Sequence, residues 1–577
     1  MVVRRALSFA AISALALCVS AHAGNIVAAD GKPFDEYLLY QEAYGFSGAV
    51  LVARGDHIAL AKGYGFADRS RNARFEDRTR INIGSLSKAY TATIILRLEQ
   101  DGLVHTSDKL GDLLPGVPDD KKSITVEQLL THTAGLAWDS VPRGKKLTRD
   151  DVLAKILAAK LRSQPGERFA YSNAGYELLA AIAETRSGRS FDALVQQYIA
   201  KPAHAQNTTI VGGTGDAGNV AHSYNEWKDL GTWREWNDGW HSGSGDVIST
   251  LIDVWKWHRA LRAGTIIQPE AAQRMFAAHV KSDDGGGYGY GWFTQHTDRG
   301  DSLVYHGGDN RGYHTELRWY VNRDLTIIVF TNLDLYDESG SGLGLHKRII
   351  ANALEKIDRG ENVPLPPRPT ATGANAEYLA SFTKSPSMEG ATVERGPTQL
   401  VFNADSQEAI NRILDLHDER LEKDNVKVAT LLDATARRDS SLVRKTLDKA
   451  NADFFLAFAF AEREELEKRL GKFKSARVCG SKPLPWDDSL VRTFALLTFE
   501  KQTVDYQFTW KRDAFYETIS ETGALHALTL PMMLVDREKN EFVVWDLVGR
   551  RGAQLTYERA GESVRLVEVA PFATISR

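Results

Sequence analysis

Hydrophobic and polar positions along residues 30–355 predict alternating helices and strands. The pattern predicts a short helix over 34–44, then a strand over 47–53 whose hairpin partner is 57–62. The apolar run that follows Ser85 and stops at Gly102 predicts a largely buried helix. Residues 316–332 predict a hairpin whose second arm, apolar throughout, is a covered strand.

Three further segments place polar residues beside predicted elements. A capping box, Thr125 to Gln128, opens a helix that ends at 131–136. Tyr171 and Asn173 stand at the entry to another apolar helix, where side chains can face a cleft. The Gly- and Trp-rich stretch 227–240 fits equally a cleft wall and a loop pinned by aromatic packing.

Residues 358–372 contain four prolines and predict a stiff linker. Beyond it, helical spacing over 405–423, 441–451 and 454–470 precedes alternating strands from Cys479 onward. Helices followed by strands are typical of an α+β domain, so we expect a C-terminal α+β domain of unknown role over 373–577. The preceding domain is expected to span 24–357.

Residues 1–23 fit a secretory signal peptide, with two arginines, an apolar run and an Ala-x-Ala site ending at Ala23. The apolar run is too short to span a membrane, so an exported, periplasmic or secreted protein is expected. A hydrophobic content of 43% and a net charge of −4 are typical of a soluble globular protein and argue against nucleic acid as a partner. The oligomeric state stays open.

Ser85 and Lys88 lie three residues apart at the start of the predicted buried helix. On a helix these side chains share one face, which places a hydroxyl nucleophile beside an amine that activates it. A Ser-x-x-Lys match alone is weak, and a second one occurs at Ser381 to Lys384. The other motifs in the chain must therefore decide whether the Ser85–Lys88 match is significant.

Other matches carry less weight. Residues 213–218 fit a dinucleotide pattern, but no periodic helix follows them. His132 is expected to be a structural hydrogen-bonding residue rather than a catalytic one, and His241 lies in a Gly/Ser loop that makes it a weaker cleft candidate than His306. There is no His-Glu-x-x-His motif and no cysteine pair, so neither a metal nor a cofactor is expected.

Three motifs remain, in chain order: Ser85-x-x-Lys88, Tyr171-x-Asn173 and His306-Gly307-Gly308. With the blocks 46–53, 129–136 and 165–176, they make residues 30–355 resemble the serine β-lactamase and penicillin-binding-protein superfamily, in particular its class C β-lactamase, D-aminopeptidase and esterase branch. The resemblance implies an α+β fold: an antiparallel sheet flanked by helices, plus an all-helical lobe, with the cleft between them.

The same resemblance implies a role for each motif residue. Ser85 would be the acylated nucleophile, Lys88 would lower the cost of deprotonating it, and Tyr171 would pass the proton to the leaving group. Which of Lys88 and Tyr171 is the base stays open. Asn173 would hold Lys88 and a substrate amide, and the backbone N–H groups of Ser85 and Asp309 would form the oxyanion hole.

The third motif departs from the family pattern. Related lactamases and carboxypeptidases usually carry Lys-Thr-Gly, which resembles a grip for a substrate carboxylate, whereas His306 is a weaker cation and Gly307 has no hydroxyl. The resemblance therefore favours an exported serine hydrolase of amides or esters. The alternatives are a β-lactamase or D-alanyl-D-alanine carboxypeptidase proper, and a non-catalytic ligand-binding sensor of the same fold.

Overall fold

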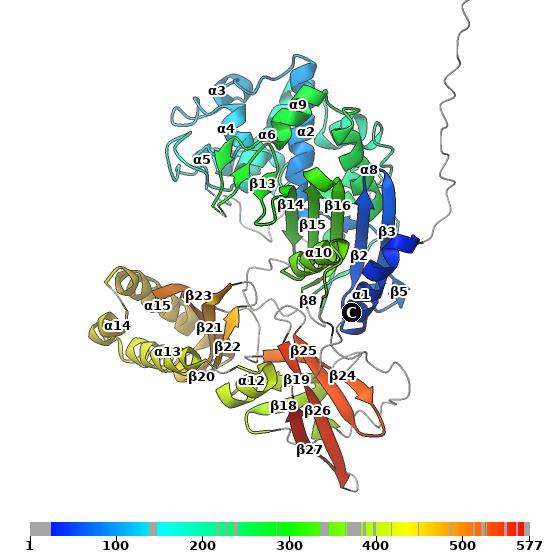
Figure 1. Ribbon diagram of the computed structural model, residues 1–577. Coiled ribbons are helices and arrows are strands. Elements are labelled where there is room, and N and C mark those ends of the chain that lie inside the picture. The colour runs from blue at the N-terminus through cyan, green and yellow to red at the C-terminus, as the bar shows by residue number, and fades with distance from the viewer. Residues whose placement is uncertain are drawn as a thin grey trace, which may run out of the picture.

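A nine-stranded antiparallel sheet forms the centre of the N-terminal part of the chain (Figure 1). The computed structural model describes residues 25–137, 147–215, 218–225, 228–235, 240–283, 285–334, 345–363, 365, 382–384, 388–395, 400–416, 418–447, 449–484, 487–511, 514–520, 526, 528–546, 551–560 and 563–570. In sheet order the strands are β1 (Ile26–Val27), β3 (His57–Tyr64), β2 (Gly48–Arg54), β16 (Leu325–Thr331), β15 (Tyr313–Tyr320), β14 (Ser302–Asn310), β13 (Phe293–His296), β12 (Gly287–Tyr288) and β11 (Val280–Lys281).

Both faces of this sheet are covered, because its central strands are apolar on both sides. In β2, Ala49 and Leu51 pack into one core while Val50 and Val52 pack into the other, as the two-residue period of a strand requires. Every residue of β16 is buried. The expectation that the second arm of the 316–332 hairpin is a covered strand is confirmed.

Helices form the two outer layers. One face carries α1 and α10, and the larger core on the other face includes α2, α6, α8 and α9. The helices of this part are α1 (Lys32–Ala43), α2 (Ser87–Gln100), α3 (Leu110–Leu113), α4 (Val126–Leu130), α5 (Arg149–Ala158), α6 (Asn173–Ser187), α7 (Phe191–Val195), α8 (Leu251–Arg262), α9 (Pro269–Phe276) and α10 (Leu345–Asp358).

Short elements connect these layers. The single turns are η1 (Ala29–Gly31), η2 (Gly84–Leu86), η3 (Gln196–Ala200), η4 (Trp233–Glu235) and η5 (Val321–Arg323). The small sheets are β6 (Ile81–Asn82), β10 (Val247–Ser249) and β7 (Thr209–Ile210); β17 (Leu333–Asp334), β8 (Ser223–Asn225) and β9 (Lys228–Gly231); and β4 (Phe66–Asp68) with β5 (Ala73–Arg74). The β6–β10 pairing places the segment just before Ser85 beside the segment that follows the loop 241–246.

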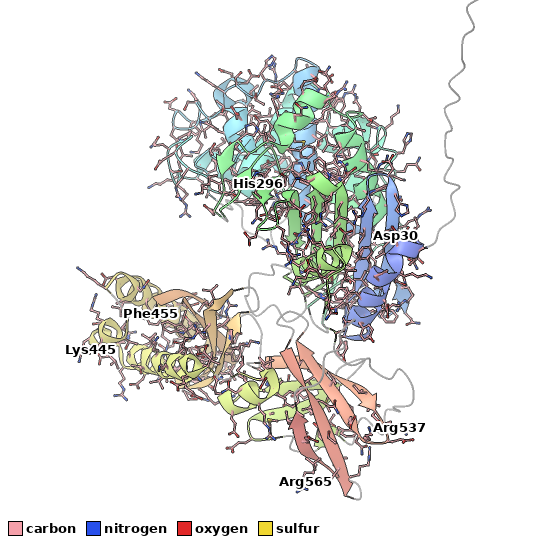
Figure 2. All side chains as sticks on the ribbon, in the orientation of Figure 1. Asp30, His296, Lys445, Phe455, Arg537 and Arg565 are labelled. Carbon is pink, nitrogen blue, oxygen red and sulfur yellow. The ribbon has the colours of Figure 1, made fainter. Side chains whose placement is uncertain are left out.

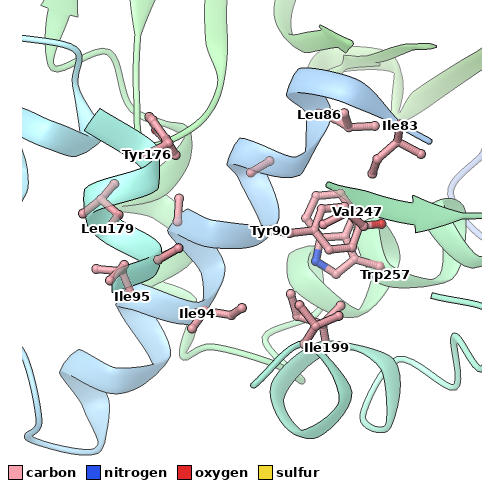
Figure 3. Close-up of a cluster of buried hydrophobic side chains, with 14 of the residues drawn as sticks. Ile83, Leu86, Tyr90, Ile94, Ile95, Tyr176, Leu179, Ile199, Val247 and Trp257 are labelled. Carbon is pink, nitrogen blue, oxygen red and sulfur yellow. The ribbon is translucent and has the colours of Figure 1, made fainter. Parts of the chain in front are cut away.

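Helix α2 runs through the larger core and is fixed there by aromatic packing (Figure 3). The rings of Tyr90 on α2 and Trp257 on α8 stack with centroids 3.9 Å apart, and both side chains are fully buried. An aromatic pair in contact stabilises the fold beyond the burial of its area. The helix that begins beside Ser85 is therefore held rigidly.

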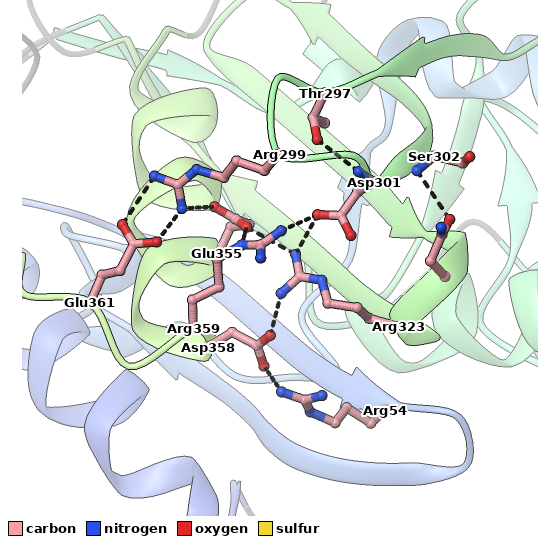
Figure 4. Close-up of polar contacts among 11 residues, drawn as sticks. Arg54, Thr297, Arg299, Asp301, Ser302, Arg323, Glu355, Asp358, Arg359 and Glu361 are labelled. Atoms are coloured by element: carbon pink, nitrogen blue, oxygen red, sulfur yellow. Dashed lines mark hydrogen bonds and ion pairs between the residues drawn. The ribbon is translucent and has the colours of Figure 1, made fainter.

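On the other face, α10 is tied to the sheet by a network of ion pairs (Figure 4). Arg323 pairs with Asp358 at 2.7 Å and with Glu355 at 2.9 Å, and Arg359 pairs with Asp301. Linked pairs of this kind fix geometry better than isolated surface pairs do. The network anchors the C-terminal half of α10 to the start of β14.

The C-terminal part contains two further sheets with two hydrophobic cores, and the first core also includes Cys479, Val491 and Phe494 from the second sheet. One sheet contains, in order, β18 (Ala391–Arg395), β19 (Leu400–Ala404), β24 (Leu528–Asp536), β25 (Glu541–Asp546), β26 (Arg551–Ala560) and β27 (Ser563–Ala570), and α12 (Gln407–Leu414) packs in its core. The other contains β20 (Phe473–Leu484), β21 (Asp487–Phe499), β22 (Thr503–Lys511) and β23 (Ala514–Ser520), with α13 (Glu419–Arg437), α14 (Ser440–Thr446) and α15 (Lys449–Leu470). A short turn, η6 (Phe382–Lys384), precedes them. Phe455 of α15, labelled in Figure 2, belongs to the second core.

The expected fold class, an antiparallel sheet flanked by helices followed by a C-terminal α+β region, is confirmed. The expectation of helices before strands in the C-terminal region missed β18 and β19; β18 pairs with β19, and β19 pairs with β24 across the whole intervening segment. The domain boundaries themselves stay a prediction, and the signal peptide lies outside the described residues. Among the residues that the structure describes, no helix combines the length and the apolar character needed to cross a bilayer.

We predict that Trp257→Ala destabilises the N-terminal part by about 3–5 kcal/mol, because it leaves a cavity against Tyr90 in a closely packed core. Thermal and denaturant unfolding followed by tryptophan fluorescence would measure the change. Val426→Ala, at a side chain that is 65% exposed, is the control and should leave the transition unchanged. An unchanged transition for Trp257→Ala would contradict the assignment of this core.

Candidate active site

Ser85 lies in η2, at the point where the chain enters α2, and is partly exposed among buried neighbours. Gly84 before it has φ +53°, a conformation that L side chains rarely adopt. A Cβ on Gly84 would lie 2.6 Å from the backbone nitrogen of Asp309. Glycine is therefore required at this position for two reasons, its backbone conformation and the lack of room for a Cβ. The close approach brings Ser85 near the end of β14.

The amine of Lys88 joins three separate segments of the chain. Lys88 is fully buried, and its Nζ donates to Ser85 Oγ at 3.1 Å, to Asn173 Oδ1 at 2.8 Å and to the carbonyl oxygen of Ser244 at 2.9 Å. Three acceptors match the three donors of a lysine ammonium. The structure thus brings Ser85, Lys88 and Asn173 together, as the first two motifs predict.

Tyr171 and Asn173 are positioned by the cap of α6. The side chain of Ser172, the residue between them, accepts the backbone N–H of Gly175 at 3.3 Å and donates to the carbonyl of Ala137 at 2.7 Å. This cap turns Tyr171 and Asn173 toward Lys88, whose Nζ lies 4.9 Å from the centroid of the Tyr171 ring.

Tyr171 is a neutral phenol in this environment. Burial raises its pKa above the ordinary value, the nearby Asp309 carboxylate raises it further, and a hydrogen bond with the Ser85 hydroxyl lowers it in part. The Tyr171 phenol therefore lies close enough to the Ser85 hydroxyl to affect its own pKa. To take a proton from Ser85, Tyr171 would first have to lose its own proton and be stabilised as the phenolate.

Gly307 and Gly308 let β14 be approached from both sides. A Cβ on Gly308 would lie 1.9 Å from the carbonyl oxygen of Ile83, on the Ser85 side of the strand. A Cβ on Gly307 would lie 2.8 Å from Glu316 Oε2, on the opposite side. The two glycines thus allow the backbone that leads to Asp309 to pack directly against the segment before Ser85.

The ring of His306 takes part in a hydrogen-bond chain rather than standing free in the cleft. Its Nδ1 lies 2.6 Å from the Gly307 carbonyl, which can only accept, so Nδ1 carries the proton. Its Nε2 lies 3.3 Å from the hydroxyl of Tyr288, which must then be the donor. The Tyr288 oxygen in turn lies 3.2 Å from Nε2 of His132.

The other end of this chain fixes His132. The backbone N–H of Ser172 donates to His132 Nδ1 at 3.0 Å, so this nitrogen is unprotonated and Nε2 donates to Tyr288. Burial, then the charge of Lys88, lower the pKa of His132 and take that of His306 to about 3. Both rings are neutral, so His306 does not act as the weak cation that its position in the third motif suggested.

Several residues of the site are absent from the motifs. Glu177 on α6 is almost fully buried, and its Oε1 lies 2.9 Å from His241 Nδ1 and accepts from Ser244 Oγ at 3.1 Å. These bonds hold the loop whose Ser244 carbonyl binds Lys88. His241, ranked below His306 as a cleft residue, thus lies beside the site and acts on that loop.

The tryptophan-rich stretch contributes packing at Trp233, which is buried and lies 5.7 Å from the ring of Tyr313. Trp227 and Trp236 lie outside the described residues. No group of three or more His, Cys, Asp or Glu side chains within the described part of the chain is arranged to hold a metal ion.

A partly exposed serine beside a buried lysine and a tyrosine, next to a covered antiparallel sheet, is an arrangement that nucleophilic catalysis by a hydroxyl can use. The β-lactamase family model matches residues 34–351, more than half of the chain, and the protein belongs to this family. It is a serine hydrolase of the β-lactamase-related type.

Two curated relatives are penicillin-binding proteins of Bacillus subtilis (strain 168). Penicillin-binding protein 4* is 28% identical over 59% of this chain and 79% of its own length. The putative penicillin-binding protein PbpX is 30% identical over 43% of this chain, and the match spans 63% of its length. A solved octameric penicillin-binding protein homologue from Pyrococcus abyssi is 15% identical, with a TM-score of 0.51 and coverage of 94% of this chain and 98% of that one, which shows a shared fold.

We predict that His306 stays neutral, with its proton on Nδ1, between pH 5 and 8. Its folded pKa of about 3 lies below the unfolded value of about 6.5, so its contribution to stability is complete above pH 6.5 and is lost as the pH falls from there toward 3. Nitrogen-15 NMR of histidine-labelled protein would report the tautomer. His526, whose pKa is raised by Asp405, is the internal contrast and should titrate higher. Protonation of His306 near pH 6.5 would contradict the hydrogen-bond chain.

Proposed function

We propose that the protein is an exported serine hydrolase that cleaves an amide or ester bond through an acyl-enzyme on Ser85. The observation that carries the proposal is the hydrogen bond from the Lys88 amine to the Ser85 hydroxyl at 3.1 Å, with the Tyr171 ring centroid 4.9 Å from the same amine. A hydroxyl nucleophile needs such a partner, because its free pKa leaves it protonated at neutral pH.

The chemistry follows from these contacts. With Lys88 as the neutral amine or Tyr171 as the phenolate, the Ser85 proton passes to that group while Oγ attacks the substrate carbonyl, and the backbone N–H groups of Ser85 and Asp309 stabilise the oxyanion. The carbon–leaving-group bond then breaks as the leaving group takes the proton, with Tyr171 as the donor. Water, deprotonated by the same groups, attacks the acyl-enzyme and releases the acid and free Ser85. Asn173 keeps Lys88 in place through its 2.8 Å bond.

Two features of the third motif favour uncharged amides or esters over β-lactams. His306 is neutral and bonded at both ring nitrogens, so it offers no cation to a substrate carboxylate. Gly307 has no hydroxyl, and the space that a side chain would need is taken by Glu316 and Lys347. Replacing a cationic side chain in the cleft by a neutral one weakens the binding of anionic substrates most.

The alternatives remain distinguishable. A β-lactamase or D-alanyl-D-alanine carboxypeptidase proper would use the same Ser85 chemistry on a carboxylate-bearing substrate. A non-catalytic sensor would bind such ligands without turnover. We also propose that residues 1–23 are a leader for export, that residues 358–372 are a linker and that residues 373–577 form a separate C-terminal domain. N-terminal sequencing of the secreted protein would test the leader.

We expect Ser85→Ala to lower hydrolysis of p-nitrophenyl esters by several orders of magnitude, because the acyl-enzyme can no longer form. Steady-state kinetics and labelling with a fluorescent fluorophosphonate, read by mass spectrometry at Ser85, would measure this. Ser302→Ala, at a partly exposed serine on the far end of β14, is the matched control and should keep both activities. Unchanged hydrolysis in Ser85→Ala would overturn the proposal, and tight ligand binding without labelling would favour the sensor.

A matched panel of a cephalosporin, a D-alanyl amide and a short-chain ester should give the highest kcat/KM for the amide or the ester. The physical reason is that the cleft presents a neutral His306 where a carboxylate would need a cation. Introducing the family motif by His306→Lys should raise the relative kcat/KM for the cephalosporin. Best turnover of the cephalosporin by the natural protein would show that the interpretation of His306 is wrong.

A further inference from the structure

A buried lysine lies behind the strand that carries the third motif. Lys347 is on α10, across the sheet from α2, and its side chain is only 1% exposed. Its Nζ donates to the carbonyl oxygen of Gly308 at 2.9 Å and to Asp309 Oδ1 at 2.6 Å. Neither the sequence motifs nor the mechanism above uses this cation.

The position of the Lys347 amine depends on Gly307. A Cβ at Gly307 would lie 3.0 Å from Lys347 Nζ and 2.8 Å from Glu316 Oε2, so a side chain there would push the amine away from the strand. The neighbouring Gly308 is required on the opposite side, against Ile83. The Gly-Gly sequence thus lets a cation reach one side of a backbone segment whose other side faces Ser85.

The carbonyl that Lys347 binds belongs to the same peptide group as a donor of the oxyanion hole. The C=O of Gly308 and the N–H of Asp309 share one planar trans unit and point in opposite directions. A hydrogen bond from a charged donor to the carbonyl polarises the peptide and strengthens the hydrogen bond that its N–H makes. It also fixes the rotation of that peptide plane.

We propose that Lys347 is a positioning residue that orients and polarises the Gly308–Asp309 peptide, so that the Asp309 N–H binds the oxyanion more strongly. The inference rests on the proposed function, because it assumes an oxyanion at Ser85. Lys347 acts from behind the sheet and never touches the substrate.

A competing explanation for the same lysine is that it only neutralises Asp309. The groups around the amine are Asp309, which also accepts from His314 at 2.7 Å, and Glu316, with the cation of Arg348 beside it on α10. Burial lowers the pKa of Lys347, and the two carboxylates oppose this shift. The experiment must therefore separate charge balance from the contact with the Gly308 carbonyl.

The test compares p-nitrophenyl acetate with its thiono analogue in the full-length protein and in Lys347→Met. Sulfur accepts hydrogen bonds poorly, so a residue that acts through the oxyanion hole matters less for the thiono ester. Deleting an oxyanion donor outright costs about 10²–10³-fold, so weakening one should lower kcat for the oxo ester by roughly 10–100-fold. The loss for the thiono ester should be smaller than about threefold. Equal losses for the two esters would overturn the proposal.

The double variant Lys347→Met/Asp309→Asn restores charge balance and keeps the backbone N–H of residue 309. We expect it to fold, as judged by thermal unfolding, and to retain the selective loss on the oxo ester. Recovery of the natural rate would show that Lys347 serves to neutralise Asp309. A double variant that does not fold would show that Lys347 serves the stability of the fold. Each result would overturn the proposal.

Arg348→Met removes the adjacent exposed cation and is the control, with rates expected to match the natural protein. Ser85→Ala separates the two hypotheses. If hydrolysis depends on Ser85 but Lys347→Met equals the natural protein, only the role of Lys347 is wrong. Hydrolysis that does not depend on Ser85 would overturn the proposed function and this inference together.

Discussion

The burial of the Lys88 amine is the constraint on which the site depends. An amine shielded from water is costly unless each of its donors finds an acceptor. The acceptors here are the neighbouring Ser85 and two groups from distant segments, Asn173 on α6 and the Ser244 carbonyl in the loop 241–246. Glu177 then holds that loop through its bonds to His241 and Ser244. Because a misplaced segment would leave the amine without an acceptor, the assembly of the core and the placement of Ser85 beside Lys88 are coupled.

A second constraint is the contact between two backbones, Gly84 beside Ser85 and Gly308 on β14. Neither position has room for a Cβ, since each would meet backbone atoms of the other segment at less than 3 Å. Such an approach needs rigid support on both sides. The stack of Tyr90 and Trp257 supplies it for α2, and the ion pairs of α10 supply it for the sheet. The N–H groups of Ser85 and Asp309 thereby come from two elements that are each fixed independently.

The sequence was informative where chemistry is local and uninformative where it depends on pairing across the fold. Ser85, Lys88, Tyr171 and Asn173 form short motifs whose order along the chain could be recognised, and the strands of the hairpins followed from period-two patterns. Glu177, Tyr288 and Lys347 stand singly on elements whose pattern says only that they are helix or strand. Their partners lie tens of residues away, and burial, which no local pattern reports, sets the charge state of His306. The pairing of β19 with β24 was not predicted for the same reason, because 123 residues separate Ala404 from its partner Leu528.

The position of the cation near β14 decides whether it binds the substrate or strengthens the proposed oxyanion hole. A lysine within a Lys-Thr-Gly motif resembles a grip for a substrate carboxylate, an interaction made equally in the ground state and the transition state. In this chain the side chain at that place is the neutral His306, and Lys347 contacts the same strand from the face opposite Ser85. A cation that acts on the Gly308–Asp309 peptide gains strength only as the oxyanion develops, so it favours the transition state rather than substrate binding. Under the proposed function, exchanging one arrangement for the other loosens the demand for an anionic substrate while Ser85 keeps its proposed role.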